Sequence, residues 1–241
     1  MTISDMIKFV DVTKCMGCRA CMVTCKNWND LPAEPEEFNG YQSHEKLTAN
    51  TWNLVEFSEV ESETNPLGYE WLMLHKSCLH CEVAACEISC PKQAIYHDSF
   101  GAVLTDPDLC TGCGICVKSC GFDVIRIGSK MVNGAEKKIS MKCTLCADRL
   151  EAGLLPACVN TCPTGSLTFG MRDEIMSLAV ERLAVVKERF PNANIYNTEN
   201  IGSGAMVYLL ADKPEMYQLP ETPELLPRLQ RLLAKRNQAT S

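Results

Sequence analysis

The sequence predicts an α+β protein built from two similar modules, and three observations support this prediction. Sixteen of the 241 residues are cysteine, and they fall into four groups of four. Short runs of apolar and β-branched residues, typical of strands, follow the cysteine groups. After residue 170 the cysteines stop, and apolar residues recur at helical spacing. Strands and helices are therefore both expected, organised around the cysteine groups.

Composition excludes several classes of protein. Hydrophobic residues make up 46% of the chain and charged residues 22%, which excludes a disordered chain. No apolar run approaches the roughly eighteen residues of a transmembrane helix. The net charge is −7 and no basic block stands out, so the usual footprint for a nucleic acid or an anionic membrane is missing. We expect a soluble chain with no nucleic-acid partner and no transmembrane segment.

The spacing of the cysteines is the most informative feature. The first and third groups both read C-x2-C-x2-C-x3-C, which is an internal repeat. The second group widens the middle gap to four residues, the fourth widens it to eleven, and proline follows both. In chain order the groups are Cys15, Cys18, Cys21 and Cys25; Cys78, Cys81, Cys86 and Cys90; Cys110, Cys113, Cys116 and Cys120; Cys143, Cys146, Cys158 and Cys162. No cysteine is left over.

Iron–sulfur chemistry explains this spacing. A [4Fe–4S] cubane needs four thiolates around a compact core, and a C-x2-C-x2-C loop turns three sulfurs toward one cluster. In two-cluster ferredoxins the fourth cysteine of such a motif ligates the other cluster of the pair. Four motifs predict two reciprocal pairs, and hence four [4Fe–4S] clusters in two ferredoxin-like modules.

Two other uses of cysteine fit this sequence less well. A disulfide framework suits a short secreted chain, whereas this chain is long enough to build its own core, and its cysteines crowd into loops. Four-thiolate zinc sites join two C-x2-C pairs by a long spacer, whereas every group here is a quartet with an x3-C tail. Iron–sulfur clusters are therefore the leading prediction, with a zinc-stabilised interaction module as the alternative from another class.

The segments between the cysteine groups contain short strand candidates. Residues 94–98 and 101–104 read as the two arms of a hairpin that turns at 99–100, and residues 124–127 and 166–169 are further candidates. Residues 26–77 form a long insertion. Two strand-like runs within it are split by turn-rich residues; the runs are 51–57 and 71–74, and the turn is 65–68.

The segment after residue 170 predicts a helix, a strand and a second helix. An apolar stripe ends before Pro191, and we expect it to pack on the core; its members are Ile175, Ala179, Leu183, Val186 and Phe190. Residues 205–210 read as a buried strand. A helix beginning at Thr222-Pro223 carries leucines on one side, and it could dock on a partner, fold back on the core or lie on a membrane.

The sequence contains no recognisable catalytic centre. No G-x-G-x-x-G follows a strand and no P-loop motif is present, so there is no nucleotide or flavin site to propose. Four histidines are too few for a second metal system, and His80 is expected to be a neighbour of a cluster or a surface residue, not a ligand. A cubane passes one electron at a time, so we expect an electron relay with no catalytic residues of its own.

The N-terminus shows no export signal, because it lacks a long apolar stretch and a twin arginine. Independent secretion is therefore not expected. Transport in complex with a signal-bearing partner stays open, so the location is left between the periplasm and the cytoplasm.

From residue 9 to 170 the order of the four motifs resembles the four-cluster iron–sulfur subunit of the dimethyl sulfoxide reductase family of molybdenum and tungsten enzymes. Residues 25–34, 142–149 and 156–170 most resemble formate dehydrogenase beta subunits, and the resemblance continues through 195–202 and 216–220. Some members carry a C-terminal membrane helix, whereas the stretch 228–241 is polar-rich here, so we expect a complex without that anchor. Lys26 and Gly121 follow the first and third groups, and neither residue is a ligand.

The resemblance implies which cysteines share a cluster, since the first group pairs with the fourth and the second with the third. We number the four implied sets I to IV. Set I is Cys15, Cys18, Cys21 and Cys162, and set II is Cys143, Cys146, Cys158 and Cys25. Set III is Cys78, Cys81, Cys86 and Cys120, and set IV is Cys110, Cys113, Cys116 and Cys90. The two modules are then nested with a pseudo-two-fold relation. The expected divisions are 1–30 with 138–170 as the outer module, 31–74 as an inserted β segment, 75–137 as the inner module, and 171–241 as a C-terminal helical extension that docks on a partner.

The resemblance also implies a function. A catalytic alpha subunit holding Mo or W on two pyranopterins would oxidise formate to carbon dioxide, and this non-catalytic subunit would relay the electrons to a cytochrome, a ferredoxin or another subunit, or run the relay in reverse. The outer module would face the catalytic subunit. Basic residues beside the motifs would offset cluster charge or be ordinary surface residues; they are Lys14, Arg19, Lys76, Lys118 and Lys142. The alternative within the family is a subunit of a sulfur-compound or arsenate reductase.

Overall fold

The computed structural model describes residues 5–34, 44–62, 65–196 and 204–220. They form one four-stranded sheet, three separate β-hairpins and several short helices, so the predicted α+β class is confirmed. None of the helices in this described part of the chain is both long enough and apolar enough to cross a membrane.

The four-stranded sheet joins the beginning of the chain to its end. Its order is β8 (Leu167–Met171), β1 (Met6–Asp11), β10 (Met206–Leu210) and β9 (Asn194–Tyr196). Strand β1 runs parallel to β10 and antiparallel to β8, and β9 is antiparallel to β10. The first strand is thus central, and its neighbours come from the last third of the chain.

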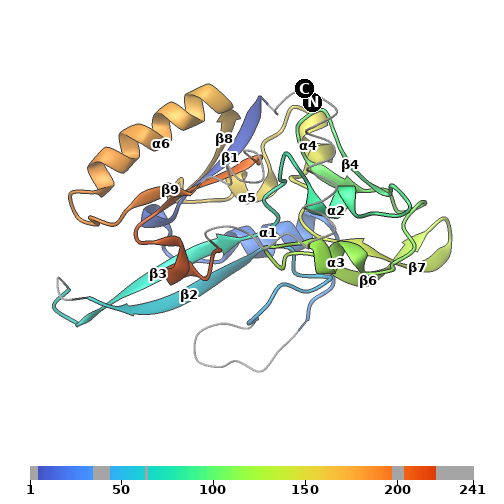
Figure 1. Cartoon of the computed structure of the whole chain (residues 1–241), viewed down its shortest axis with the longest axis horizontal. Coiled ribbons are helices and arrows are strands. Elements are labelled where there is room, and N and C mark those ends of the chain that lie inside the picture. The colour runs from blue at the N-terminus through green and yellow to red at the C-terminus, as the bar shows by residue number, and fades with distance from the viewer. Residues whose placement is uncertain (1–4, 35–43, 63–64, 197–203, 221–241) are drawn as a thin grey trace.

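Alternation along β1 places different residues on the two faces of this sheet. Ile7 and Phe9 face α6 (Arg172–Val186), where they pack with Ile175, Ala179 and Val186. Figure 1 shows α6 lying over this face of the sheet. The opposite face contributes Val10, Met206, Tyr208 and Leu210 to the large core that also contains most of the cysteines. The sheet therefore separates α6 from the cysteine-rich half of the molecule.

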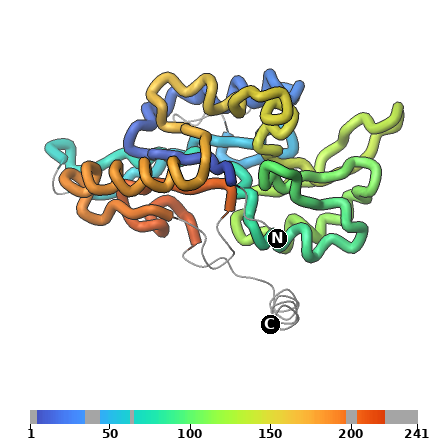
Figure 2. The backbone as a smooth tube through the Cα atoms, turned by 90° about the horizontal axis from the view of Figure 1, so that it is seen from above, coloured from blue at the N-terminus to red at the C-terminus, as the bar shows by residue number. Residues whose placement is uncertain are grey.

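Three antiparallel hairpins complete the strands. They are β2 (Leu54–Glu61) with β3 (Tyr69–Lys76), β4 (Ile95–His97) with β5 (Val103–Thr105), and β6 (Arg126–Val132) with β7 (Ala135–Met141). The β6–β7 turn is Asn133-Gly134, both with positive φ, as a two-residue hairpin turn requires. Figures 1 and 2 show the β2–β3 and β6–β7 hairpins reaching toward opposite ends of the molecule.

The short helices mostly contain or adjoin cysteines. They are α1 (Ala20–Trp28), α2 (Ala85–Ile88), α3 (Ile115–Ser119), α4 (Ala147–Glu151) and α5 (Ala157–Asn160), with 3-10 turns η1 (Val12–Lys14) and η3 (Pro214–Tyr217). The repeat in sequence is also a repeat in backbone shape, since Gly17 and Gly112 occupy equivalent positions with φ of 68° and 66°. A Cβ at Gly112 would lie 2.5 Å from the Lys138 carbonyl oxygen, and one at Gly17 would lie 2.9 Å from the Phe57 ring. Glycine is needed at both turns.

Most expected elements are confirmed, with shifted ends. The hairpin of residues 94–104 and the buried strand at 206–210 are present, and the stripe of α6 packs on the core, although the helix ends at Val186 before reaching Phe190. The extension after residue 170 is not only helical, because β9 and β10 cover an edge of β1 that would otherwise be unpaired. The helix expected from residue 222 lies outside the described residues, and the module boundaries remain a prediction.

Candidate cluster-binding sites

Three cavities in the described structure are each lined by four cysteines, of which three come from one group and one from another. The four cysteines of set I line the first cavity, those of set III the second, and those of set IV the third. In each cavity the C-x2-C loop supplies two of the four thiols. The other two come from a short helix or from the residues just after one. Cysteines that are far apart in sequence are thereby brought to the same cavity.

The cysteines of set II lie together around the contact between α1 and α5. Cys25 and Cys158 come from these two helices, and Cys146 caps the start of α4. Burial raises the pKa of the Cys25 thiol well above its usual value, and the neighbouring Cys143, Cys158 and Cys146 raise it further. The four sets implied by the resemblance are thus the sets that lie close together, and their ligation of iron remains a prediction.

The chemistry of these thiols fits a cubane cluster. All sixteen cysteines are free, so the described structure contains no disulfide framework. In the described ranges, no three His, Cys, Asp or Glu side chains converge on a single-ion position. The thiols of sets I, III and IV instead border a space, as a cluster with several iron atoms requires.

Burial makes several of these thiols reluctant to ionise. It raises the pKa of Cys21 to about 12 and that of Cys146 to about 12, with nearby cysteines adding to the effect. A thiolate is the form that binds iron, so each site must compensate for buried negative charge. Two buried lysines supply this compensation.

Lys8 is the first buried cation, and it is only 1% exposed. Burial alone would lower its pKa, but the thiolates of set II, with Cys158 foremost, raise it above the usual value. Its ammonium group lies 3.3 Å from Nε2 of His75 and donates to the hydroxyl of Ser77, also at 3.3 Å. Lys8 therefore stays charged beside set II.

Lys142 is the second buried cation, and it has the same role beside set III. It is 4% exposed, and its ammonium group donates to the carbonyl oxygens of Val103 and Cys143. Burial lowers its pKa, whereas the thiolates of Cys78, Cys86 and their neighbours raise it above the usual value overall. The two lysines place one positive charge near set II and one near set III.

The structure separates the basic residues that the sequence suggested. Lys142 is buried among cysteines, and Arg19 lines the set I cavity. Lys14 and Lys76 instead form ion pairs with Asp11 and Glu56, and Lys118 is exposed. Sequence reasoning missed Lys8 altogether, although a lysine within the apolar run Ile7-Lys8-Phe9-Val10 is a signal that could have revealed it.

His80 is a buried residue and not a surface one. It is 1% exposed, and its Nδ1 accepts a hydrogen bond from the backbone N–H of Val103 at 2.9 Å. Burial lowers its pKa well below the usual value, and the nearby Lys142 and Lys8 lower it further, so the ring is neutral. The structure therefore places His80 close to the buried lysines, inside the cysteine-rich half.

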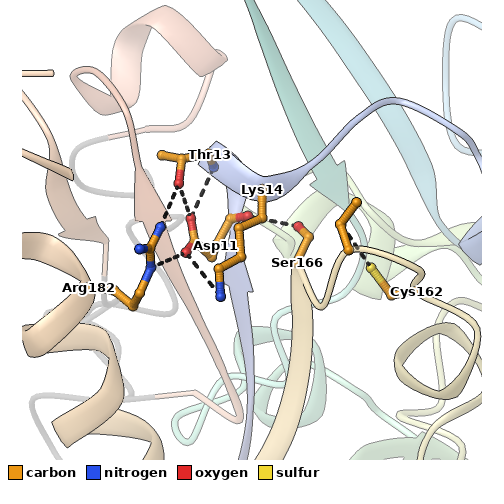
Figure 3. A network of polar contacts seen from close by, with 7 residues as sticks. Asp11, Thr13, Lys14, Cys162, Ser166 and Arg182 are labelled. Carbon is orange, nitrogen blue, oxygen red and sulfur yellow. Dashed lines mark hydrogen bonds and ion pairs between the residues drawn. The ribbon is translucent and has the colours of Figure 1, made fainter. Parts of the chain in front are cut away.

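A polar network holds the two chain segments that carry set I (Figure 3). The side chain of Asp11 accepts hydrogen bonds from the backbone and hydroxyl of Thr13 and from Nε of Arg182. The hydroxyl of Ser166 donates to the backbone carbonyl of Asp11 at 2.8 Å. The turn that leads to Cys15 is thus fixed against the strand that follows Cys162.

The fold and these sites define an iron–sulfur protein of the ferredoxin type. Family models described as "4Fe-4S dicluster domain" match residues 14–94 and 69–172. The chain therefore contains two dicluster ferredoxin-type domains and carries several [4Fe–4S] clusters.

Curated relatives identify the family. The chain is 39% identical to the formate dehydrogenase-O iron-sulfur subunit of Escherichia coli, over 92% of this chain and 73% of that protein. It is 38% identical to the nitrate-inducible formate dehydrogenase iron-sulfur subunit of the same organism, over 92% and 74%. It is also 35% identical to formate dehydrogenase 2 subunit beta (cytochrome c-553) of Nitratidesulfovibrio vulgaris, over 86% and 94%. The chain belongs to the formate dehydrogenase iron–sulfur subunits and is an electron-transfer subunit.

Proposed function

We propose that this subunit relays single electrons through four [4Fe–4S] clusters, one held by each of sets I to IV. Each cubane, when bound, takes up and releases one electron at a time. The chain itself holds the clusters in place, shields the clusters of sets II and III from water and supplies the positive charges of Lys8 and Lys142. No catalytic residue is assigned to it.

The order of the sets is supported by thiols of different sets that lie near each other. Burial raises the pKa of Cys21 in set I, and Cys158 of set II adds to this effect. In the same way Cys143 of set II adds to the raised pKa of Cys78, a member of set III. Cys116 of set IV likewise adds to the strong effect of burial on Cys86 of set III. The sets therefore follow one another as I, II, III and IV.

Exposure of the cysteines is the single observation that carries the proposal of a relay with two ends. Cys18 of set I and Cys113 of set IV are the exposed cysteines, whereas every cysteine of sets II and III is buried or half-buried. Because electron transfer to a partner requires a close approach, the exposed sets are the natural points of entry and exit. The buried sets connect them.

The nested organisation follows from the same sets. Sets I and II draw their cysteines from residues 15–25 and 143–162, and sets III and IV from residues 78–120. We therefore propose an outer module of residues 1–30 with 138–170 and an inner module of residues 75–137, separated in sequence by the insertion 31–74. The described residues 171–196 and 204–220 extend the outer module, since β9 and β10 belong to the sheet of β1. We propose that residues 221–241 dock on a partner.

For the partners, we propose a catalytic subunit that holds molybdenum or tungsten on pyranopterins at the set I end, and a redox carrier at the set IV end. The names of the relatives as formate dehydrogenase subunits support formate as the electron donor of the complex. One relative's name includes cytochrome c-553, which supports a cytochrome as the carrier. The relay can run in either direction.

The experiment that tests the proposal is a metal and sulfide analysis of the anaerobically purified complex. After subtraction of the content of the separately purified catalytic subunit, this chain should carry about sixteen iron and sixteen sulfide, as four cubanes require. Stoichiometric zinc, or iron for only two clusters, would contradict it. Variants of Cys18 and Cys113 then test the two ends, because each should remove a different cluster.

A further inference from the structure

His75 on strand β3 connects the buried Lys8 to the set I cavity. The imidazole is 2% exposed, and it lines the cavity together with the four cysteines of set I. Its Nε2 lies 3.3 Å from the ammonium nitrogen of Lys8. The ring therefore contacts a fixed positive charge and borders the space where a cluster is proposed to lie.

The contact with Lys8 determines which ring nitrogen carries the proton. A lysine ammonium group has three donors and no acceptor, so Nε2 of His75 must accept. Burial lowers the pKa of His75 well below its usual value, and Lys8 lowers it further, so the ring is neutral. A neutral imidazole with an accepting Nε2 carries its single proton on Nδ1.

This Nδ1–H group has no hydrogen-bond partner within the described protein. A buried donor without a partner is costly, and such groups in native proteins call for an explanation. The lining of the set I cavity offers one, because a cluster there presents sulfur acceptors to the groups around it. His75 is thus a buried donor without a protein partner, and it lines a proposed cluster site.

We propose that His75 donates an Nδ1–H hydrogen bond to a sulfur of the cluster in set I and thereby raises its reduction potential. This inference rests on the proposed function, since it requires a cluster in that cavity. Reduction adds one negative charge to the cluster, and a hydrogen bond to its sulfur stabilises the more negative state. Lys8 acts as a positioning residue, because its contact with Nε2 selects the tautomer that donates.

Three variants of His75 separate this donor from the rest of the side chain. His75→Asn places an amide N–H near the position of Nδ1 and removes the acceptor for Lys8. His75→Gln keeps an acceptor near the position of Nε2 and removes the donor. His75→Leu removes both. Tyr208→Phe is the matched control, because it deletes only the hydrogen bond from the tyrosine hydroxyl to the backbone carbonyl of His75.

The measurement is an EPR-monitored redox titration of the complete complex. We expect His75→Gln and His75→Leu to make reduction of the set I cluster about tenfold less favourable, a shift of about 59 mV to more negative potential for one electron. His75→Asn should keep the reduction potential of the set I cluster close to the wild-type value, because its amide N–H replaces the lost donor. Tyr208→Phe should leave that potential at the wild-type value. Equal potentials in the Asn, Gln and wild-type complexes, with all clusters present, would overturn the proposal.

A second measurement uses only the wild-type complex, so it does not depend on the assembly of any variant. In wild-type complex labelled with ¹⁵N-histidine, pulsed EPR should detect a histidine nitrogen weakly coupled to the set I cluster, and no such coupling would overturn the proposal. Iron analysis of the same sample shows whether the set I cluster is present at all. A missing set I cluster would contradict the proposed function, whereas a cluster that is present but uncoupled would contradict only the role of His75.

Discussion

Asp11 and Arg182 form an ion pair of 2.9 Å although 171 residues separate them in the chain. The carboxylate of Asp11 is 1% exposed, whereas the guanidinium is about one quarter exposed. The pair connects the end of β1, directly before the first cysteine group, to α6, which follows the last one (Figure 3). The helix is in this way attached to the segment that positions set I.

Replacing Arg182 by leucine should destabilise the protein by about 2–3 kcal/mol, because it leaves a buried carboxylate without its main cation. Lys14, 3.9 Å from the same carboxylate, offsets part of the loss. Thermal unfolding of the complete complex measures the effect. Arg189→Leu is the matched control, since Arg189 is 71% exposed and pairs with Glu70 at 3.7 Å, and it should change stability by less than about 0.5 kcal/mol. Equal effects of the two variants would refute a special role for the Asp11 pair.

The proposed reciprocal ligation predicts which cysteine variants alter the same EPR signal. Cys25 belongs to the first group in sequence but lies with set II, so Cys25→Ser should perturb the same centre as Cys146→Ser. Cys18→Ser should perturb a different one. EPR spectra of the three variants, recorded at matched potentials, make the comparison. A shared effect of Cys25→Ser and Cys18→Ser on a single centre would show that each group of four binds its own cluster.

Removing either buried cation should lower the potential of the cluster beside it, and Lys8→Met should also affect the set I cluster through its contact with His75. Lys8→Met leaves the negative charge of set II uncompensated, and Lys142→Met does the same for set III. Each variant should therefore shift the potential of its cluster by tens of millivolts in the negative direction. A tenfold change in the reduction equilibrium corresponds to about 59 mV. Redox titration measures both shifts. Lys118→Met, at an exposed position in the third cysteine group, is the control that should leave every potential unchanged. An equal shift from Lys118→Met would mean that only net charge matters.

Division of labour between the subunits is also testable. The isolated chain should show no formate oxidation with an artificial dye, because its described residues provide cluster sites and no other recognised centre. The catalytic subunit alone should retain some dye-linked activity, and adding this chain should restore electron delivery to the natural carrier. Formate-dependent dye reduction by the isolated chain, free of molybdenum and tungsten, would contradict the relay.

Cysteine spacing predicted more of the candidate sites than of the fold around them. Local patterns were sufficient for α6, whose stripe has a 3.6-residue period, and for the hairpin of residues 94–104. The parallel pairing of β1 with β10 has no local signal, since residues 8 and 206 are joined only by tertiary structure. The contact of Lys8 with His75 depends on that pairing and on β3, so neither residue could be assigned a role from sequence spacing alone.

The proposed discontinuity of the outer module implies an order of assembly. Every cysteine of sets III and IV lies between residues 78 and 120, so with the proposed ligation we expect their clusters to be inserted while the rest of the chain is still being synthesised. Sets I and II stay incomplete until the fourth group emerges from the ribosome, and β1 finds its parallel neighbour only after residue 210. Until then, the thiols of Cys15, Cys18 and Cys21 are exposed to oxidation and to adventitious metals. We therefore expect the nascent N-terminus to need protection until contacts between distant segments form, such as the hydrogen bond from Ser166 to Asp11.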